Sequence, residues 1–191
     1  MVLPDWAWHL LGPTILDPFE PELVNVTSYD LRLGRVIRLQ RWQGEEMPDT
    51  PAILAQDGAV LFKDPVLHRL FPDRRPFLPG DAVLASTQER FNVPRWVRLQ
   101  GHLKSSVARA GCNHRSALYI DPGFHGFLTL ELDFKVSGFL IPGRRIIQVE
   151  AETVLPWKQY RGHYNGQGQA APNRNPEVAF QPTAFAAEKE E

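Results

Sequence analysis

Glu131 is the acidic residue whose setting in the sequence most suggests chemistry. It lies within Phe-Leu-Thr-Leu-Glu-Leu-Asp-Phe at residues 127–134, where apolar and polar residues alternate. Because successive residues of a strand face opposite sides of a sheet, the leucines form one face, and Thr129 and Glu131 share the other. A carboxylate in the middle of a strand is held more rigidly than one on a loop, which suits a general base. Exposed acids are common on strands, however, so the pattern alone favours a solvated Glu131.

The segment Lys-Ser-Ser-Val-Ala-Arg at residues 104–109 is a candidate phosphate site. It follows a predicted strand, and Ser105 and Ser106 stand where a short helix would begin. Serine at a helix start caps free backbone N–H groups, and those groups also attract anions. Lys104 and Arg109 add positive charge, and an arginine can grip two phosphate oxygens. Taken alone, the segment is explained as simply by an ordinary capped turn.

Two other polar segments are candidates for ligand contacts. Asp121 opens the turn Asp-Pro-Gly-Phe-His-Gly, where its carboxylate can either face a sugar hydroxyl or bond only to its own backbone. Residues 160–167 are polar, aromatic and interrupted by glycine. Such a segment can serve as a lid that closes over a ligand, or it can be an ordinary loop.

Several other functions are excluded or disfavoured by composition. The formal net charge is −1 and no run of Lys or Arg marks a nucleic-acid groove, so no nucleic-acid partner is expected. No apolar stretch reaches the roughly 20 residues of a membrane span, and no signal peptide is recognisable. The single cysteine, Cys112, allows no intrachain disulfide, which fits a reducing cytoplasm. No His-x-x-x-His, Gly-x-Ser-x-Gly or Walker motif occurs.

The elements that must position these residues are short. Seventeen prolines and fourteen glycines separate stretches rich in β-branched and aromatic residues, which predicts an all-β barrel or sandwich. The predicted strands are 30–33, 36–39, 52–54, 59–62, 82–84, 96–99, 127–134 and 146–149. Short helices are predicted at 5–11, 65–71 and 105–110. We expect one domain over residues 1–165 and a flexible tail over 166–191, because the tail is polar and contains Gly, Pro and charged residues.

Taken together and in this order, these motifs resemble the dCTP deaminase branch of the dUTPase superfamily. The resemblance begins at Ile15 to Gly34, with Asp-Pro-Phe at 17–19 and Ser-Tyr-Asp-Leu-Arg-Leu-Gly at 28–34. It continues through 78–80, 84–89, 104–109 and 117–132, and it closes with Tyr160, His163 and Gln167. The fold implied is a dUTPase-like distorted β-barrel of the β-clip type with a few short helices. The family also implies a homotrimer with active sites at subunit interfaces.

The resemblance assigns roles to individual residues. It implies that Glu131 is the general base that takes a proton from the attacking water. It places the side chains of Ser105 and Arg109 and the backbone carbonyl of Ala117 around that water. The substrate-binding residues that it implies are Lys104, Ser105, Ser106, Arg109, Asp121, Thr129, Leu130, Tyr160, His163 and Gln167.

The reaction implied is hydrolytic deamination of dCTP to dUTP and ammonia. Mg²⁺ would arrive with the triphosphate, whose oxygens it prefers, and no protein metal ligand is expected. Zinc-dependent nucleobase deaminases need a cysteine pair, which one cysteine cannot supply, so no zinc is expected. Partial burial of Glu131 would raise its pKa and make it a better proton shuttle.

Two alternatives remain open. Asp121 also resembles the water-activating aspartate of dUTPases, so the chain could be a bifunctional deaminase and diphosphatase, or a dUTPase, giving dUMP. It could instead be a non-catalytic trimer that senses dCTP, dUTP or dTTP or binds a partner. This sequence differs from the family pattern at three positions. Lys104 occupies a position where the family usually has Arg, His163 one where it has Lys, and Phe134 one where it often has Asn. Lysine lacks the planar fork of arginine, and histidine is only partly charged at neutral pH.

Overall fold

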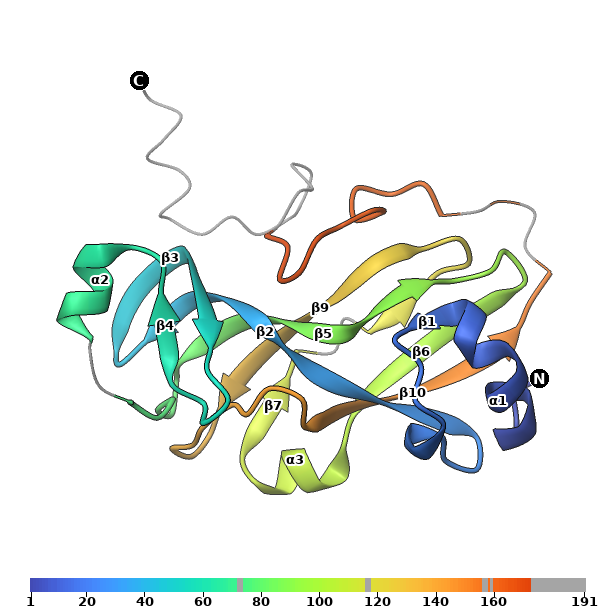
Figure 1. Ribbon diagram of the computed structural model, residues 1–191, viewed down its shortest axis with the longest axis horizontal. Coiled ribbons are helices and arrows are strands. Elements are labelled where there is room, and N and C mark those ends of the chain that lie inside the picture. The colour runs from blue at the N-terminus through green and yellow to red at the C-terminus, as the bar shows by residue number, and fades with distance from the viewer. Residues whose placement is uncertain (72–73, 116–117, 156–157, 159, 173–191) are drawn as a thin grey trace.

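The computed structural model describes residues 1–71, 74–115, 118–155, 158 and 160–172. Short helices and turns connect the strands of one curled sheet (Figure 1). In chain order the elements are α1 (Asp5–Ile15), β1 (Leu16–Asp17), η1 (Pro21–Leu23), β2 (Ser28–Trp42), β3 (Glu45–Leu54), β4 (Val60–Phe62), α2 (Pro65–Leu70), β5 (Ala82–Asn92), β6 (Val97–Leu103), α3 (Ser105–Arg109), β7 (Cys112–His114), β8 (Tyr119–Ile120), β9 (His125–Phe134) and β10 (Arg145–Thr153).

The sheet runs in the order β7-β9-β5-β2-β10-β6-β8, with every named pair antiparallel. The long strand β2 crosses the middle of the molecule and pairs with β5, β10 and β3, which lets the sheet curl around the core. The predicted all-β, distorted-barrel fold with a few short helices is confirmed.

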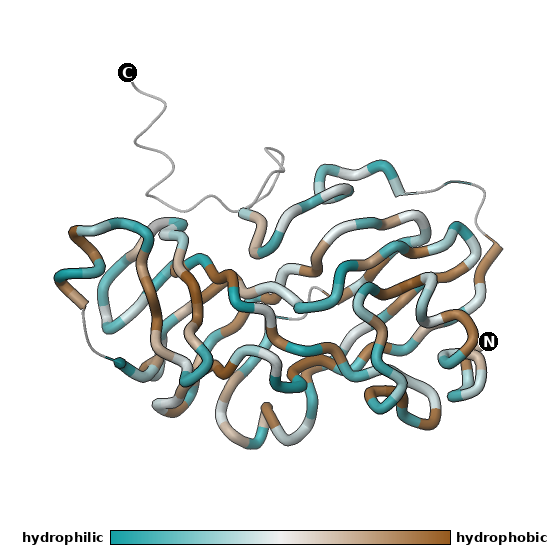
Figure 2. The backbone as a smooth tube through the Cα atoms, viewed as in Figure 1, coloured by the Kyte–Doolittle hydropathy of each residue, from teal (hydrophilic) through white to brown (hydrophobic). Residues whose placement is uncertain are grey.

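Burial of alternate side chains drives this curl. On β9, Leu128, Leu130, Leu132 and Phe134 are buried, while the residues between them are partly exposed, as the alternation predicts. Other large core side chains come from β2 and α1, and Trp8 and Tyr29 stack with ring centroids 5.7 Å apart. Apolar segments follow the strands, whereas residues 158–168 are mostly polar (Figure 2).

The three predicted helices and most of the predicted strands are present, with different bounds. The stretches 30–33 and 36–39 are parts of one strand, because Gly34 does not end it. A Cβ on Gly34 would lie 2.6 Å from Ser86 Oγ and 2.8 Å from the carbonyl of Thr87, so glycine here permits close approach of β5. The short strands β1, β7 and β8 carry too few residues for a detectable alternation and were not predicted.

The packed part of the chain extends beyond the expected boundary at residue 165. Gln167, Ala170 and Ala171 are buried, and Gln167 forms a parallel bridge with Gly126 of β9. Residues 173–191, which include most of the predicted tail, lie outside the described part of the chain. Among the helices that the structure describes, none is long and apolar enough to cross a membrane.

Candidate active site

Glu131 projects from the centre of β9 on the face opposite the leucines. Its neighbours across the sheet are Leu84 of β5 and residues of β7, where His114 is the partner of Leu132. The Glu131 side chain is 29% exposed, yet its Oε2 atom is buried and has no hydrogen-bond partner among the residues described. Burial raises the pKa of Glu131 to about 7. The carboxyl can therefore both accept and release a proton near neutral pH.

His114 lies beside this carboxyl but does not form an ion pair with it. Burial lowers the pKa of His114 to about 4, so the imidazole is neutral at physiological pH. Its Nε2 atom accepts a hydrogen bond from the backbone N–H of Glu131 at 3.3 Å and lies 3.5 Å from Glu131 Oε2. Since Nε2 is the acceptor, the ring proton is on Nδ1. The neutral ring fixes the backbone of Glu131 without neutralising its charge.

Arg115 is the cation that acts on Glu131 within one chain. Its backbone N–H donates to the carbonyl of Glu131 at 3.0 Å, and its Nε lies 3.5 Å from Asp133 Oδ2. The positive charge of Arg115 lowers the pKa of Glu131, but burial has the larger effect. Sequence reasoning did not single out Arg115 or His114, because β7 has only three residues, Arg115 directly follows it, and so short a strand gives no periodic signal. The role predicted for Arg109 stays a prediction.

The C-terminal segment lies along the polar face of β9. The backbone N–H of Ala171 donates to Thr129 Oγ1 at 3.1 Å, and Gln167 Nε2 donates to the carbonyl of Phe127 at 2.6 Å. Gly126 permits this approach, because its φ is +130° and a Cβ there would lie 2.7 Å from the carbonyl oxygen of Gln167. Residues 166–171 therefore cover the strand face that carries Glu131.

Asp121 and Tyr160 line one hollow of about 360 Å³, together with Arg98, Tyr119 and Lys158. The backbone N–H of Tyr160 donates to the carbonyl of Pro122 at 2.8 Å, which joins this segment to the turn that Asp121 opens. The hollow combines an acid, two cations and two aromatic rings, a set that suits a polar ligand with a ring. His163 is exposed on the segment that follows.

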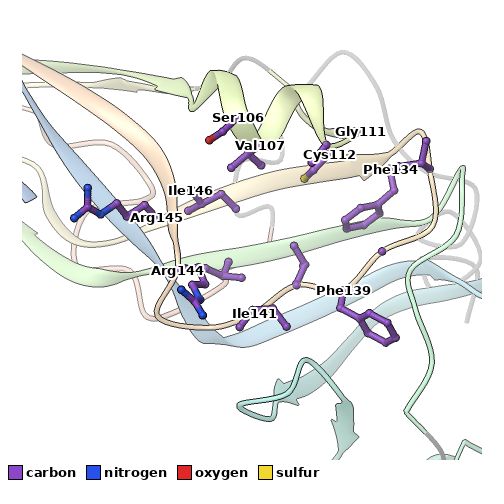
Figure 3. A pocket seen from close by; sticks show the side chains of 15 residues that line it. Ser106, Val107, Gly111, Cys112, Phe134, Phe139, Ile141, Arg144, Arg145 and Ile146 are labelled. Carbon is purple, nitrogen blue, oxygen red and sulfur yellow. The ribbon is translucent and has the colours of Figure 1, made fainter.

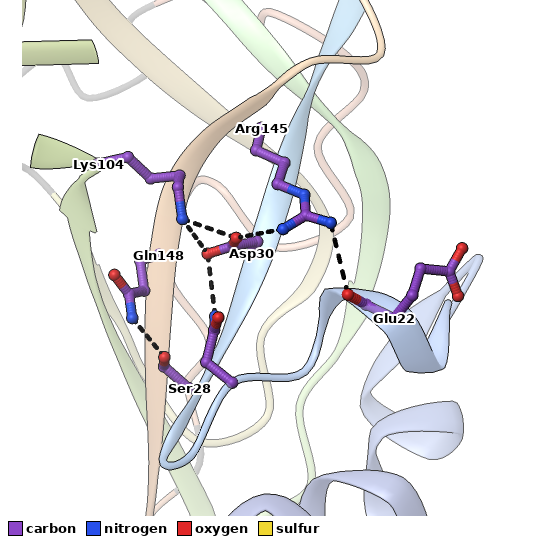
Figure 4. A network of polar contacts seen from close by, with 7 residues as sticks. Glu22, Ser28, Asp30, Lys104, Arg145 and Gln148 are labelled. Atoms are coloured by element: carbon purple, nitrogen blue, oxygen red, sulfur yellow. Dashed lines mark hydrogen bonds and ion pairs between the residues drawn. The ribbon is translucent and has the colours of Figure 1, made fainter. Parts of the chain in front are cut away.

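Lys104 and the start of α3 lie beside a second polar cluster (Figure 4). Lys104 Nζ donates to both carboxylate oxygens of Asp30, at 2.6 and 2.7 Å, and Asp30 is fully buried. Arg145 Nη1 lies 3.4 Å from the same carboxylate. Gln148 Nε2 donates to Ser28 Oγ at 2.5 Å on the neighbouring strands. Sequence reasoning identified Lys104 but not the polar groups that hold it.

A mostly apolar hollow of about 420 Å³ adjoins α3 (Figure 3). Ser106, Val107 and Ile146 lie on one side of it, and Phe139 and Ile141 lie on the other. Burial raises the pKa of the Cys112 thiol, which also lines it, to about 12, so this cysteine is not an activated nucleophile.

Comparison with known proteins identifies the family. A family model described as dCTP deaminase-like matches residues 7–154. The chain belongs to the dCTP deaminase family. A Thermobifida fusca protein named "dCTP deaminase, dUMP-forming" is 36% identical over 179 residues, covering 86% of each chain. A Nanoarchaeum equitans protein with the same name is 35% identical over 167 residues, covering 78% of this chain and 83% of its own.

A solved structure supports the fold independently. The 2'-deoxycytidine 5'-triphosphate deaminase from Agrobacterium tumefaciens superposes with a TM-score of 0.56 at 20% identity. The match covers 80% of this chain and 48% of that chain, so this chain spans about half the length of that protein. The family predicted from the sequence motifs is thus confirmed.

The predicted site residues of this deaminase-family chain fall into two groups. Thr129, Glu131 and Gln167 lie on or against the polar face of β9, whereas Lys104 and Ser106 lie at α3. Within the part of the chain that the structure describes, no hydrogen bond or ion pair joins the two groups. The side chain of Leu130 is fully buried in the core, and Ser105 and Arg109 are exposed. Ala117 lies outside the described residues.

No group of three or more His, Cys, Asp or Glu side chains gathers at metal-binding distance among the residues that the structure describes. The acids nearest to each other in the site are Glu131 and Asp133 on β9, whose partners are His114, Asn113 and Arg115. The cations near α3 are instead arranged around a single carboxylate, that of Asp30.

Proposed function

We propose that this chain deaminates dCTP and then hydrolyses the product to dUMP. In the first step water adds to C4 of cytosine, and ammonia leaves to give dUTP. In the second step a second water attacks the phosphate chain, giving dUMP and pyrophosphate. The names of the relatives from T. fusca and N. equitans support dUMP as the final product. This proposal favours the bifunctional alternative over dUTP as the end product.

The burial of Glu131 is the main observation that supports its role as the general base of deamination. Water is a poor nucleophile, so a base must take its proton as the C–O bond forms, which contributes roughly 10²–10⁴-fold. A base with a pKa near the working pH is the most effective at both accepting and returning the proton. Glu131 meets this requirement, because burial raises its pKa to about 7 and its Oε2 has no partner among the described residues. Glu131 gives this proton to N3 of the cytosine as water adds to C4, and it then moves the proton of the new C4 hydroxyl to the amino group, which leaves as ammonia.

We assign the remaining roles by family resemblance and placement. Ser105, Arg109 and the carbonyl of Ala117 would position the water. Asp121 would bind the sugar hydroxyl, and in the second step it would activate the water that attacks the phosphate chain. The hollow that Asp121 shares with Tyr160 supports this role, because its acid, cations and rings suit a nucleoside.

Lys104 and Ser106 would bind phosphate, with Mg²⁺ arriving as part of the substrate complex, because its preferred ligands are oxygens. Tyr160, His163 and Gln167 would close over the triphosphate. Gln167 would have to exchange its present bond to the carbonyl of Phe127 for a contact with the ligand.

We further propose that the protein works as a homotrimer. Glu131 lies on the β9 face and the candidate phosphate-binding residues lie at α3, and no hydrogen bond or ion pair joins these two groups within the described part of one chain. Assembly of copies would bring α3 of one chain to the β9 face of its neighbour. Sedimentation equilibrium at micromolar concentration should give three times the mass of 21.7 kDa. A fully active monomer would contradict the shared site.

One incubation experiment tests the reaction. The protein is mixed with Mg²⁺ and dCTP, or with Mg²⁺ and dUTP, and the nucleotides are separated by ion-exchange chromatography at several times. We expect dUMP and ammonia from dCTP, and dUMP from dUTP. Accumulation of dUTP alone would restrict the chain to deamination. Failure to consume dCTP would reject the assignment and favour the non-catalytic alternative. Asp121→Asn should slow dUMP release from dUTP, and Glu131→Gln provides the inactive control for deamination.

A further inference from the structure

Asp30 and the two cations around it carry an unbalanced charge (Figure 4). Asp30 lies on β2 with a fully buried carboxylate, which is stable only if it is paired. Lys104 supplies that pairing with contacts of 2.6 and 2.7 Å to the two oxygens, and Asn25 Nδ2 adds a hydrogen bond at 3.1 Å. With Arg145 the cluster holds two positive charges and one negative charge, so its net charge is +1.

Arg145 carries the positive charge of this cluster that is the less well neutralised. Its guanidinium makes two long contacts within the described part of the chain: Nη1 lies 3.4 Å from Asp30 Oδ2, and Nη2 lies 3.5 Å from the carbonyl of Glu22. The carboxylate of Glu22 points away from the cluster (Figure 4). Arginine has five N–H donors, and the Arg145 side chain is 49% exposed, so most of its donor capacity faces solvent.

Arg145 also lies beside the α3 residues to which we assign phosphate binding. The backbone N–H of Lys104 donates to the carbonyl of Ile146 at 3.0 Å. Lys104, which directly follows β6, is therefore bonded to the residue next to Arg145 on β10. Arg145 and Ser106 line the same hollow beside α3 (Figure 3).

We propose that Arg145 binds the distal phosphates of the nucleotide and thereby selects triphosphates over shorter nucleotides. Lys104 is already neutralised by Asp30, whereas the planar fork of Arg145 is free to grip two phosphate oxygens. Asp30 holds the two cations side by side, so it acts as a positioning residue. This inference rests on the proposed function, because it assumes that the ligand is a deoxycytidine nucleotide.

The test compares Arg145→Gln with Arg144→Gln, each introduced into full-length Glu131→Gln protein. Arg144 is the adjacent residue, is exposed and lines the same hollow, so its replacement makes the same change in net charge at nearly the same place. Isothermal titration calorimetry measures the dissociation constants of dCTP, dCDP and dCMP with Mg²⁺. Arg145→Gln should weaken dCTP binding by about ten- to a hundredfold, the usual effect of losing charge-assisted hydrogen bonds. Arg144→Gln should change it less than about threefold, and dCMP binding should be equal in both.

Each result decides the proposal. Equal dCTP affinities for the two variants, or an equal loss for dCMP and dCTP in Arg145→Gln, would overturn it while leaving the proposed function intact. A Glu131→Gln parent that binds none of the three nucleotides would overturn both. Arg145→Lys keeps the charge but loses the fork, so it should show an intermediate loss for dCTP. This variant decides the question if Arg145→Gln proves poorly folded by circular dichroism.

Discussion

Replacing Glu131 by glutamine should abolish deamination and should also make the protein more stable at alkaline pH. Glutamine keeps the shape of the side chain but cannot accept a proton, so the general base is lost. The gain in stability has a separate cause. At alkaline pH the wild-type carboxylate is ionised in a partly buried position, where Oε2 finds no hydrogen-bond partner among the described residues.

The size of the effect follows from the shift in pKa, from 4.5 in the unfolded chain to about 7 in the folded chain. At 1.36 kcal/mol per unit, a shift of about 2.5 units corresponds to about 3.4 kcal/mol, and solvent screening of the partly exposed side chain reduces it to about 2–3 kcal/mol. Because the folded-state pKa is raised, the folded state holds the proton more tightly. The destabilisation is therefore absent below about pH 4.5, grows as the pH rises to 7, and is constant above that value.

The assay is urea unfolding of wild type and Glu131→Gln at pH 5 and pH 8, at one fixed protein concentration. The variant should gain about 2–3 kcal/mol at pH 8 and less than about 1 kcal/mol at pH 5. Glu150→Gln, which changes an exposed strand glutamate, should stay within about 0.5 kcal/mol of wild type at both pH values. If Glu131→Gln matches wild type at both pH values, burial does not destabilise the carboxylate, and the argument for a base tuned to neutral pH fails.

Three further predictions concern the same site. The turnover number at saturating dCTP should rise about tenfold from pH 6 to pH 8 with a midpoint near 7, and Arg115→Gln should move this midpoint to higher pH, because Arg115 lowers the pKa of Glu131. Gly126→Ala should release residues 166–171 from β9, since the added Cβ would lie 2.7 Å from the carbonyl oxygen of Gln167. Limited proteolysis should then cut after residue 160 more readily, and KM for dCTP should rise. His163→Lys should tighten dCTP binding, measured by calorimetry in the Glu131→Gln background, because lysine is the family's usual residue there and carries a compact positive charge. An unchanged dissociation constant would remove His163 from the phosphate contacts.

The fold was predictable where hydrophobic alternation is long. The eight residues from Phe127 to Phe134 gave both the strand and its buried face, because the period of two is repeated four times. Gly34 misled the prediction, since glycine usually ends a strand but here permits β5 to approach. The strands β7 and β8 have three and two residues, too few to show any period, and only pairing across the sheet defines them.

The site was predictable in its residue types but not in its partners. Motif order predicts Glu131, Lys104 and Asp121 as site residues, because their spacing along the chain resembles the family pattern, and these roles stay predictions. Asp30 and Arg145 are more than a hundred residues apart in sequence, so no local pattern connects their charges. The pairing of β7 with β9, which no local pattern reveals, is what brings Arg115 beside Glu131.

The separation of the two groups of site residues within one chain has an electrostatic consequence for the assembled site. Two unit charges 5 Å apart at an effective dielectric constant of about 20 interact by about 3 kcal/mol, which is roughly two pKa units. An unpaired cation that close to Glu131 would return its pKa to the ordinary value and remove its advantage as a base at neutral pH. A cation that assembly brings beside Glu131 must therefore be neutralised, by a protein carboxylate or by bound phosphate, for this pKa to persist. Lys104 is already paired with Asp30, whereas Arg109, which we place beside the attacking water, would be neutralised by the triphosphate. The negative charge of the triphosphate would then neutralise Arg145 when the nucleotide binds, so the pKa of Glu131 would stay near 7 during the reaction.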